Sequence, residues 1–268
     1  MDGKMGKPDM NDRDVQNTIE NNFIELCLAA ARASSGKIVS EKGYSYTKDC
    51  LMAWYDRIFA LREPALRSPD FFCDMKSRIS KGELPRSIFL SSELVSRGID
   101  KQFLNHGFEP FYEQTGMATH HGQKEFALTS DEEIRPIKTD DELNEWIGCL
   151  ERVFGKKRSK ALYERLSTHR GISLWGLYSA KIMVSTVLIL TDGKTAGLHL
   201  IGTHPEFRHR GFGTKMTAFA VNRCFQEKNE AVVLLSSNMG KALYAQLGFR
   251  EQGKVLHLKL SNPKTGST

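Results

Sequence analysis

Residues 201–214 read Ile-Gly-Thr-His-Pro-Glu-Phe-Arg-His-Arg-Gly-Phe-Gly-Thr. The apolar run before them, at 195–200, predicts a buried strand, and the amphipathic pattern after them, at 215–225, predicts a helix. The glycines and arginines therefore belong to a strand-to-helix turn. Because Gly211 and Gly213 lack a Cβ, the backbone of this turn can approach a ligand closely and offer it the N–H groups that a helix start leaves unpaired.

Two arginines make this turn a candidate anion site. Arg208 and Arg210 supply permanent charge and forked donors that suit phosphate oxygens, so the turn predicts a phosphate or pyrophosphate at the helix start. A Gly-x-Gly pair before a helix can also be a simple tight turn. The common nucleotide motifs are absent from the sequence: there is no Gly-x-x-x-x-Gly-Lys-Ser/Thr, and no third glycine follows Gly213 at dinucleotide-fold spacing.

The hydrophobic pattern on both sides of the turn predicts the order β-α-α-β-β-β-α-β-α-β for the second half of the chain. Helices are expected from Thr139, whose hydroxyl can cap the first turn, and from 215. Further helices are expected at 159–169 and 239–247, and strands at 134–137, 172–178, 182–191, 195–203, 231–236 and 249–260.

The hydrophobic pattern of the first half of the chain also predicts a series of helices and strands. Its helices are expected at 18–33, 71–79 and 94–106, and its strands at 37–40, 51–59 and 87–90. A short motif also recurs: Leu90-Ser91-Ser92 with a later Gly107-Phe108 parallels Leu235-Ser236-Ser237 with a later Gly248-Phe249. We therefore expect a loose N-terminus at 1–17, a first domain at 18–117, a linker at 118–131 and a second domain at 132–262.

Two motifs together carry a family resemblance. Residues 208–213 match the Arg-x-x-Gly-x-Gly pyrophosphate loop of the GCN5-related N-acetyltransferases (GNAT). Ser236, Gly240, Tyr244 and the Leu-Gly-Phe at 247–249 resemble the Ser-x-x-Gly-x-x-x-Tyr-x-x-Leu-Gly-Phe ending of the same family. The resemblance covers 134–260 well and the first half in outline.

The resemblance implies an α/β (α+β) fold of the acyl-CoA N-acyltransferase type. Its sheet would be mixed and mostly antiparallel, flanked by helices and arranged in two GNAT-like lobes. Since the first half contains no Arg-x-x-Gly-x-Gly, that half would be a degenerate copy without the cofactor loop. It would serve as a scaffold or as a wall of the acceptor site.

The resemblance also implies how acetyl-CoA binds. In this family the pantetheine arm lies where two strands splay apart, the first of which corresponds to 198–203, and the pyrophosphate lies on the loop. Asn238 either contacts the cofactor arm or caps the helix that follows it. The residues implied as cofactor-binding are Leu200, Ile201, Gly202, Thr203, Arg208, His209, Arg210, Gly211, Phe212, Gly213, Thr214 and Asn238.

Tyr244 is implied as the catalytic residue. In the family pattern this hydroxyl protonates the departing thiolate, a role that suits a phenol with a pKa of about 10. The alternative is that the ring packs in the core and its hydroxyl makes a structural hydrogen bond. The base that accepts the proton of the amine stays open among Glu206, His199, His204 and a chain of waters.

The composition of the 268 residues is that of a globular protein, with 40% apolar and 26% charged residues. No apolar run is long enough to span a membrane, and the first residues lack the apolar core of a secretory signal, so we expect a cytoplasmic protein. The five cysteines form no Cys-x-x-Cys pair, and His120-His121 has no ligand partners at metal spacing, so no metal site is expected.

The net charge of +6 is modest, and most of it is dispersed. One dense cluster, Lys156-Lys157-Arg158 with Lys160, predicts either a solvated helix start or contact with an acidic partner. No aromatic-interleaved basic face accompanies it, so nucleic acid is not an expected partner.

Together these features predict direct transfer of an acetyl group from acetyl-CoA to an amine, a small molecule or a peptide, in the second domain. The alternatives are a non-catalytic CoA-binding or scaffold module and, third, a nucleic-acid-binding protein. The sequence defines neither the acceptor nor the oligomeric state.

Overall fold

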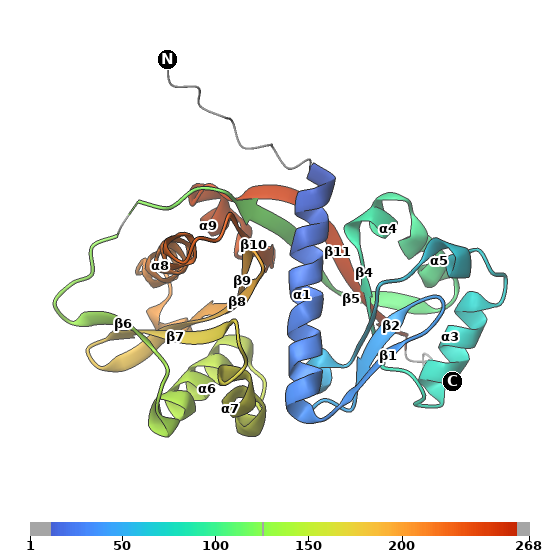
Figure 1. The fold of residues 1–268 in the computed structure, drawn as a ribbon, viewed down its shortest axis with the longest axis horizontal. Helices are drawn as coiled ribbons and strands as arrows, with labels where there is room; N and C mark the ends of the chain where they lie inside the picture. The colour runs from blue at the N-terminus through green and yellow to red at the C-terminus, as the bar shows by residue number, and fades with distance from the viewer. Residues whose placement is uncertain (1–11, 125, 262–268) are drawn as a thin grey trace, which may run out of the picture.

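A computed structural model describes residues 12–124 and 126–261 of the chain. The strands of these residues form one 11-stranded sheet in the order β1-β2-β3-β4-β11-β5-β10-β9-β8-β7-β6. Neighbouring strands are antiparallel except for the pairs β3–β4 and β9–β10, which are parallel. Figure 1 shows two halves of this sheet on either side of the long helix α1. The mixed, mostly antiparallel sheet with flanking helices confirms the predicted fold class.

The second half of the chain has the predicted order of elements. Four strands form an antiparallel meander: β6 (Glu132–Pro136), β7 (Ile172–Ser179), β8 (Ile182–Asp192) and β9 (Thr195–Thr203). Helix α8 (Phe212–Gln226) then crosses to β10 (Ala231–Ser236). The remaining helices are α6 (Asp140–Phe154), α7 (Lys160–Ser167) and α9 (Lys241–Gln246).

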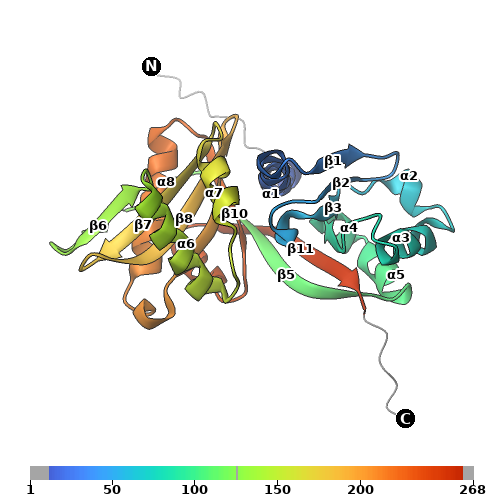
Figure 2. The ribbon, with the colours of Figure 1, turned by 90° about the horizontal axis from the view of Figure 1, so that it is seen from below.

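The helices cover both faces of this half. Apolar side chains of α6 and α7, among them Trp146 and Leu162, share one core with α1. Helix α8 lies on the other face (Figure 2), where its residues Met216 and Val221 belong to a second core. Helix α6 begins with the predicted cap: Thr139 Oγ1 accepts from the Glu142 N–H at 3.2 Å, and the Glu142 carboxylate accepts from the Thr139 N–H at 3.0 Å.

The first half matches the predicted strands at 37–40 and 87–90 and the predicted helix at 71–79, and it departs from the predictions elsewhere. Its elements are β1 (Lys37–Ser40), β2 (Ser45–Lys48), β3 (Arg57–Phe59), α2 (Glu63–Leu66), α3 (Phe71–Ser80), β4 (Ser87–Leu90), α4 (Ser92–Ser96) and α5 (Ile99–Asn105).

Two predictions in this half are wrong in part. The strand predicted at 51–59 is a 3₁₀ turn at Ala53–Tyr55 followed by the short β3, because Asp56 Oδ1 accepts from the Cys50 N–H at 2.8 Å and closes a loop. The helix predicted at 94–106 is two helices, because Gly98 takes a φ of +73°, which a right-handed helix does not contain.

The two halves exchange their last strands. Strand β5 (Phe108–Thr119) ends the first half but pairs with β10 of the second, and β11 (Arg250–Leu260) ends the second half but pairs with β4 of the first. These two long strands also pair with each other along most of their length. The sheet is therefore continuous, and the core of the first half contains Leu258 from the end of the chain.

The predicted segment borders shift accordingly. Helix α1 (Asp12–Ser34) starts earlier than Thr18, because Val15 is buried against β5 and β10, so 12–17 are helical rather than loose. Residues 1–11 lie outside the described residues. The predicted linker at 118–131 begins inside β5, where Ala118 is buried and pairs with Val233.

Helix α1 contacts both halves. Its buried face carries small residues, among them Cys27, Ala29 and Ala30, which let the helix approach the sheet closely. Asn22 Nδ2 donates to the Leu190 carbonyl of β8 at 3.1 Å, and Glu20 accepts from the backbone N–H of Ser92, next to β4, at 2.9 Å. Within the part of the chain that the structure describes, neither α1 nor another helix is long and apolar enough to cross a membrane.

The strand exchange predicts that neither half folds alone. Residues 1–119 expressed without the rest should remain unfolded, because β4 would lose the strand that separates it from β5 and the core would lose Leu258. Circular dichroism and thermal unfolding would measure this. Co-expression with residues 120–268 is the control and should restore one cooperative transition. A cooperative transition of 1–119 alone would contradict the prediction.

Candidate active site

Strands β9 and β10 separate after a short parallel stretch. Their pairing covers Thr195–Gly197 against Ala231–Val233 and then stops. Beyond this point the register between β8 and β9 shifts at Thr186, and Leu200 takes a φ of +52°, so β9 bulges. Thr186 Oγ1 donates to the Leu200 carbonyl at 3.0 Å and stabilises the bulge. The two strands therefore splay apart, as the family resemblance implied.

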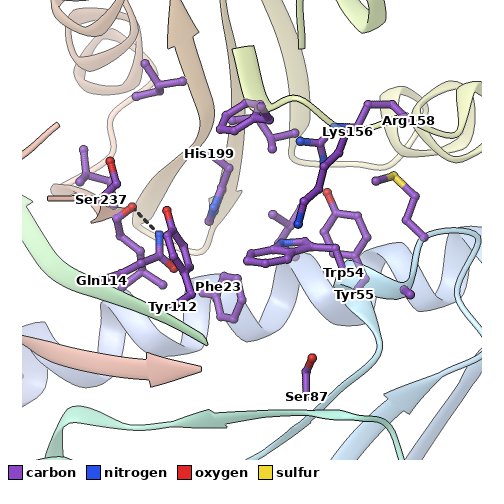
Figure 3. A pocket seen from close by; sticks show the side chains of 18 of the residues that line it. Phe23, Trp54, Tyr55, Ser87, Tyr112, Gln114, Lys156, Arg158, His199 and Ser237 are labelled. Atoms are coloured by element: carbon purple, nitrogen blue, oxygen red, sulfur yellow. Dashed lines mark hydrogen bonds between the residues drawn. The ribbon is translucent and has the colours of Figure 1, made fainter. Parts of the chain in front are cut away.

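A cavity of about 940 Å³ opens at this separation. Leu198, His199, Leu200 and Ile201 line it from β9, and Tyr244 lines it from α9. Figure 3 shows Ser237, Gln114 and Tyr112 on one side of the cavity, Lys156, Arg158 and Trp54 on the other, and His199 between them. The cavity thus has walls from both halves of the chain.

The turn after β9 leaves the start of α8 open. His209 and Gly211 take φ values of +62° and +80°, and Gly211 is the N-cap without a side-chain cap. The first bond of the helix runs from the Lys215 N–H to the Gly211 carbonyl at 3.0 Å. The N–H groups of Phe212, Gly213 and Thr214 precede this bond, so they are available to an anion.

The side chains of the turn are held by local contacts. Arg208 Nε donates to the Thr203 carbonyl at 3.3 Å, and the Arg210 guanidinium lies 5.3 Å from the Phe207 ring centroid. Space around Gly213 is tight: a Cβ there would lie 3.2 Å from both Leu243 Cδ1 and Thr203 Oγ1, so these side chains would have to shift slightly. Gly202 and Thr203 continue β9 and pair with Thr186 and Ser185 of β8.

Tyr244 lies in the cavity with its ring 5.8 Å from that of Phe249. Burial raises the pKa of its phenol above the ordinary value, so the hydroxyl keeps its proton at neutral pH. Asn238 is exposed, and α9 begins at Lys241 with Gly240 as a cap that makes no side-chain bond. The structure therefore contradicts the helix-cap role that the sequence left open for Asn238.

His199 is oriented by a residue of α1. Asn22 Nδ2 donates to the Leu190 carbonyl, so Asn22 Oδ1 is an acceptor; His199 Nε2 lies 2.8 Å from it and must donate. The lone pair of the imidazole is then on Nδ1. Burial lowers the pKa of His199 to about 4, so the ring is neutral at physiological pH. Gly197 makes this contact possible, because a Cβ there would lie 1.6 Å from Asn22 Oδ1.

The two other candidate bases face different surroundings. His204 is buried, and its Nδ1 accepts from the Glu206 N–H at 3.3 Å, which gives the imidazole a structural role. Glu206 is exposed, and neither residue lines the cavity. Of the three side chains considered from the sequence, only His199 shares the cavity with Tyr244.

The sequence indicated that the first half could form a wall of the acceptor site, but it did not identify the residues of that half that line the cavity. Phe23, Trp54, Tyr55 and Tyr112 are distant along the chain, and no local pattern connects them. The basic cluster at 156–158 was visible as a charge pattern, but its place at the cavity depends on how α6 and α7 pack. Among the described residues, no group of His, Cys, Asp and Glu side chains could hold a metal ion.

The surroundings of His199 predict an acid-sensitive fold. An unfolded chain protonates a histidine near pH 6.5, whereas folded His199 resists protonation down to about pH 4. The unfolded state therefore binds the extra proton in this window, and the free energy of unfolding falls as the pH is lowered from about 6.5 towards 4. In His199→Gln the decrease in stability with falling pH should be smaller than in the wild type, as measured by Tm between pH 7.5 and 4.5. The exposed His121→Gln should keep the wild-type slope; parallel curves for wild type and His199→Gln would refute the assignment.

Comparison with known proteins agrees with the geometry. The family described as acetyltransferase (GNAT) domain matches residues 117–257. No curated protein matches the sequence. Similar solved structures include a GCN5-related N-acetyltransferase from Kribbella flavida, with 13% identity and a TM-score of 0.68 over 90% of this chain and 96% of that one.

Two further structures share the fold at low identity. A GCN5-related N-acetyltransferase from Sphaerobacter thermophilus has 13% identity and a TM-score of 0.59 over 78% of this chain and 73% of that one. A tandem GNAT protein from the clavulanic acid biosynthesis pathway has 11% identity and a TM-score of 0.59 over 95% of this chain and 98% of that one. Since the family match spans more than half of the chain and the fold agrees, this protein belongs to the GNAT acetyltransferase family.

Proposed function

We propose that this protein transfers an acetyl group from acetyl-CoA directly to an amine. The observation that carries the proposal is the shared cavity. The splayed strands, the neutral imidazole of His199 and the protonated phenol of Tyr244 meet there. The transferase class rests on the family; the acetyl donor and the amine acceptor are the proposed part.

The cofactor site that we propose consists of the second half of β9 and the turn that follows it. The N–H groups of Phe212, Gly213 and Thr214, with Arg208 and Arg210, would hold the pyrophosphate. The backbone of Leu200, Ile201, Gly202 and Thr203 would bond to the amides of the pantetheine arm, because β10 no longer pairs with this part of β9. The remaining loop residue, His209, would contribute its backbone. Asn238 would lie at the edge of the arm.

The chemistry assigns one step to each side chain. Acetyl-CoA supplies an acetyl group activated as a thioester. His199 Nδ1 accepts a proton from the amine as the nitrogen attacks, and the N–H groups at Leu200 and Ile201 are the proposed donors to the carbonyl oxygen. The new N–C bond forms, the C–S bond breaks, and the Tyr244 hydroxyl donates its proton to the departing sulfur.

We also propose that the first half is a copy of the same fold without its cofactor turn. Strands β1, β2 and β3 form an antiparallel meander, and β4 then lies parallel to β3, as β10 lies parallel to β9. The crossover between β3 and β4 contains Pro64 near the start of α2 but no Gly-x-Gly. One acetyl-CoA per chain is therefore expected, and the first half would contribute the acceptor wall.

Replacing the phenol tests the proposed acid. Tyr244→Phe should lower kcat about a hundredfold and leave the Kd for acetyl-CoA nearly unchanged, because only the proton donor is removed. Release of free thiol with a panel of primary amines measures kcat, and calorimetry measures Kd. Tyr46→Phe, which alters a tyrosine in the distant core of the first half, is the control. Full turnover by Tyr244→Phe would exclude the role.

Two glycines with matched backbones test the pyrophosphate turn. Gly211→Ala and Gly193→Ala both place a Cβ at a positive φ, +80° and +60°, with no atom within 4 Å of it. Both should lower stability by about 1 kcal/mol. Only Gly211→Ala should weaken acetyl-CoA binding, by about tenfold or more, in calorimetry. Equal affinities for the two variants would contradict the assignment of the turn.

The second candidate function is a CoA-binding module without turnover. It predicts acetyl-CoA binding that Gly211→Ala weakens, together with no thiol release above the uncatalysed rate for any amine. The same two measurements therefore separate it from the transferase.

A further inference from the structure

We propose that the acceptor is a primary amine that carries a carboxylate on an aromatic or apolar body. The inference rests on the proposed transferase function and deepens it. It comes from the part of the cavity beyond His199, where cations and aromatic rings gather without a carboxylate.

The charges that line the cavity are all positive. Lys156, Lys157 and Arg158 border it, and none of its lining residues in the described chain carries a carboxylate. The nearest acidic side chain in sequence, Glu151, is already bound: it accepts from Lys157 Nζ at 3.1 Å and from the Arg158 backbone N–H at 2.9 Å. No ion pair neutralises Lys156 within 12–124 and 126–261. The guanidinium of Arg158 rests over the Phe154 ring at 5.1 Å, and its buried Nε makes no hydrogen bond.

A further cation is buried behind the aromatic wall. Arg57 is fully buried, with its guanidinium carbon 4.6 Å from the Trp54 ring centroid, and Trp54 lines the cavity. Its hydrogen bonds go to the Trp54 carbonyl, at 2.8 Å, and to His257 Nδ1, and its Nε has no partner. The adjacent Asp56 bonds to the Cys50 N–H instead. Burial lowers the pKa of His257, so His257 is neutral, and within residues 12–124 and 126–261 no carboxylate forms an ion pair with Arg57.

This arrangement selects for an anion and against a second cation. A buried charge without a counter-ion is costly, so an anionic group in the cavity lowers the energy of the buried Arg57, and it is also attracted by the exposed Lys156 and the half-buried Arg158. The same field disfavours the ammonium form of the acceptor, which must lose its proton before it attacks. A carboxylate on the acceptor therefore contributes binding while the amine arrives in its neutral form.

The remaining wall indicates the body of the acceptor. Phe23, Trp54, Phe111 and Tyr112 line the cavity, and the rings of Trp54 and Tyr112 meet edge to face at 6.0 Å. Such walls bury flat apolar groups well. In Figure 3 Lys156 and Trp54 lie on one side of His199, and Ser237 lies on the other. An amine near His199 can thus extend its acidic end towards Lys156 and Arg158.

Matched acceptors test the inference on the full-length protein. One set is 4-(aminomethyl)benzoate, its amide 4-(aminomethyl)benzamide, and benzylamine; a second is L-phenylalanine, its amide, and 2-phenylethylamine. With saturating acetyl-CoA, thiol release should give the acid of at least one set a kcat/KM at least about tenfold above its two partners. Equal or better turnover of the amides or plain amines in both sets, or of the polyamine spermidine, would overturn the inference and leave the transferase function intact.

Binding provides a readout that does not need turnover. If no amine releases thiol, the proposed transferase function fails, and calorimetry on the CoA-loaded protein then decides the inference separately. The acid should bind at least about tenfold more tightly than its amide and its amine. Equal affinities, or no binding of either acid, would refute the carboxylate site.

Variants of the basic cluster locate the carboxylate. Lys156→Met and Arg158→Met should each raise the KM for the acid about tenfold. Each should therefore reduce the ratio of kcat/KM for the acid to kcat/KM for the plain amine. Lys156 is exposed, so its replacement leaves the fold intact even if Arg158→Met does not fold. Lys157→Met is the matched control: its side chain is 95% exposed and held by Glu151, so the preference should persist. If Lys156→Met and a folded Arg158→Met both keep the wild-type preference for the acid over the plain amine, the proposal is contradicted.

Discussion

The separation of β9 from β10 after Gly197 is the constraint on which the rest of the site depends. While the two strands pair, their backbone groups bond to each other. Once the bulge at Leu200 turns β9 away, the following backbone is left to other partners, and a cavity opens beside it. The open turn at the start of α8 follows the far end of the same strand. A single irregular strand thus aligns both ends of the proposed cofactor site.

Helix α1 determines what faces this opening from the other side. Asn22 fits against Gly197 only because that position has no side chain, and from there it fixes the proton of His199 on Nε2. Since α1 also binds Ser92 through Glu20, its position depends on both halves of the sheet. The orientation of the proposed base is therefore linked to the packing of the whole chain.

A polar chain crosses the exchanged strands beneath the cavity. Arg57 donates to His257 Nδ1, His257 Nε2 donates to Gln114 Oε1 at 2.9 Å, and Gln114 Nε2 donates to the Leu235 carbonyl at 3.0 Å. Each donor in this series of hydrogen bonds determines whether the next group donates or accepts. The side-chain amide of Gln114 therefore has one orientation, and the imidazole of His257 has one tautomer. The chain connects β3, β11, β5 and β10. These hydrogen bonds help to hold the charged Arg57 in an aromatic core.

The sequence by itself determined the local elements of the second half and the glycine turn that precedes α8, because glycine positions, helix caps and hydrophobic period act over a few residues. Thr139 and Gly211 are examples, and β9 was predicted with its observed ends. Only the tertiary structure decided the exchange of β5 and β11, the place of His199 in the cavity beside Tyr244 and apart from Glu206 and His204, and the first-half residues that line this cavity. These depend on contacts between residues far apart in the chain, such as Asn22 with His199 and Arg57 with His257, and no local pattern encodes such contacts.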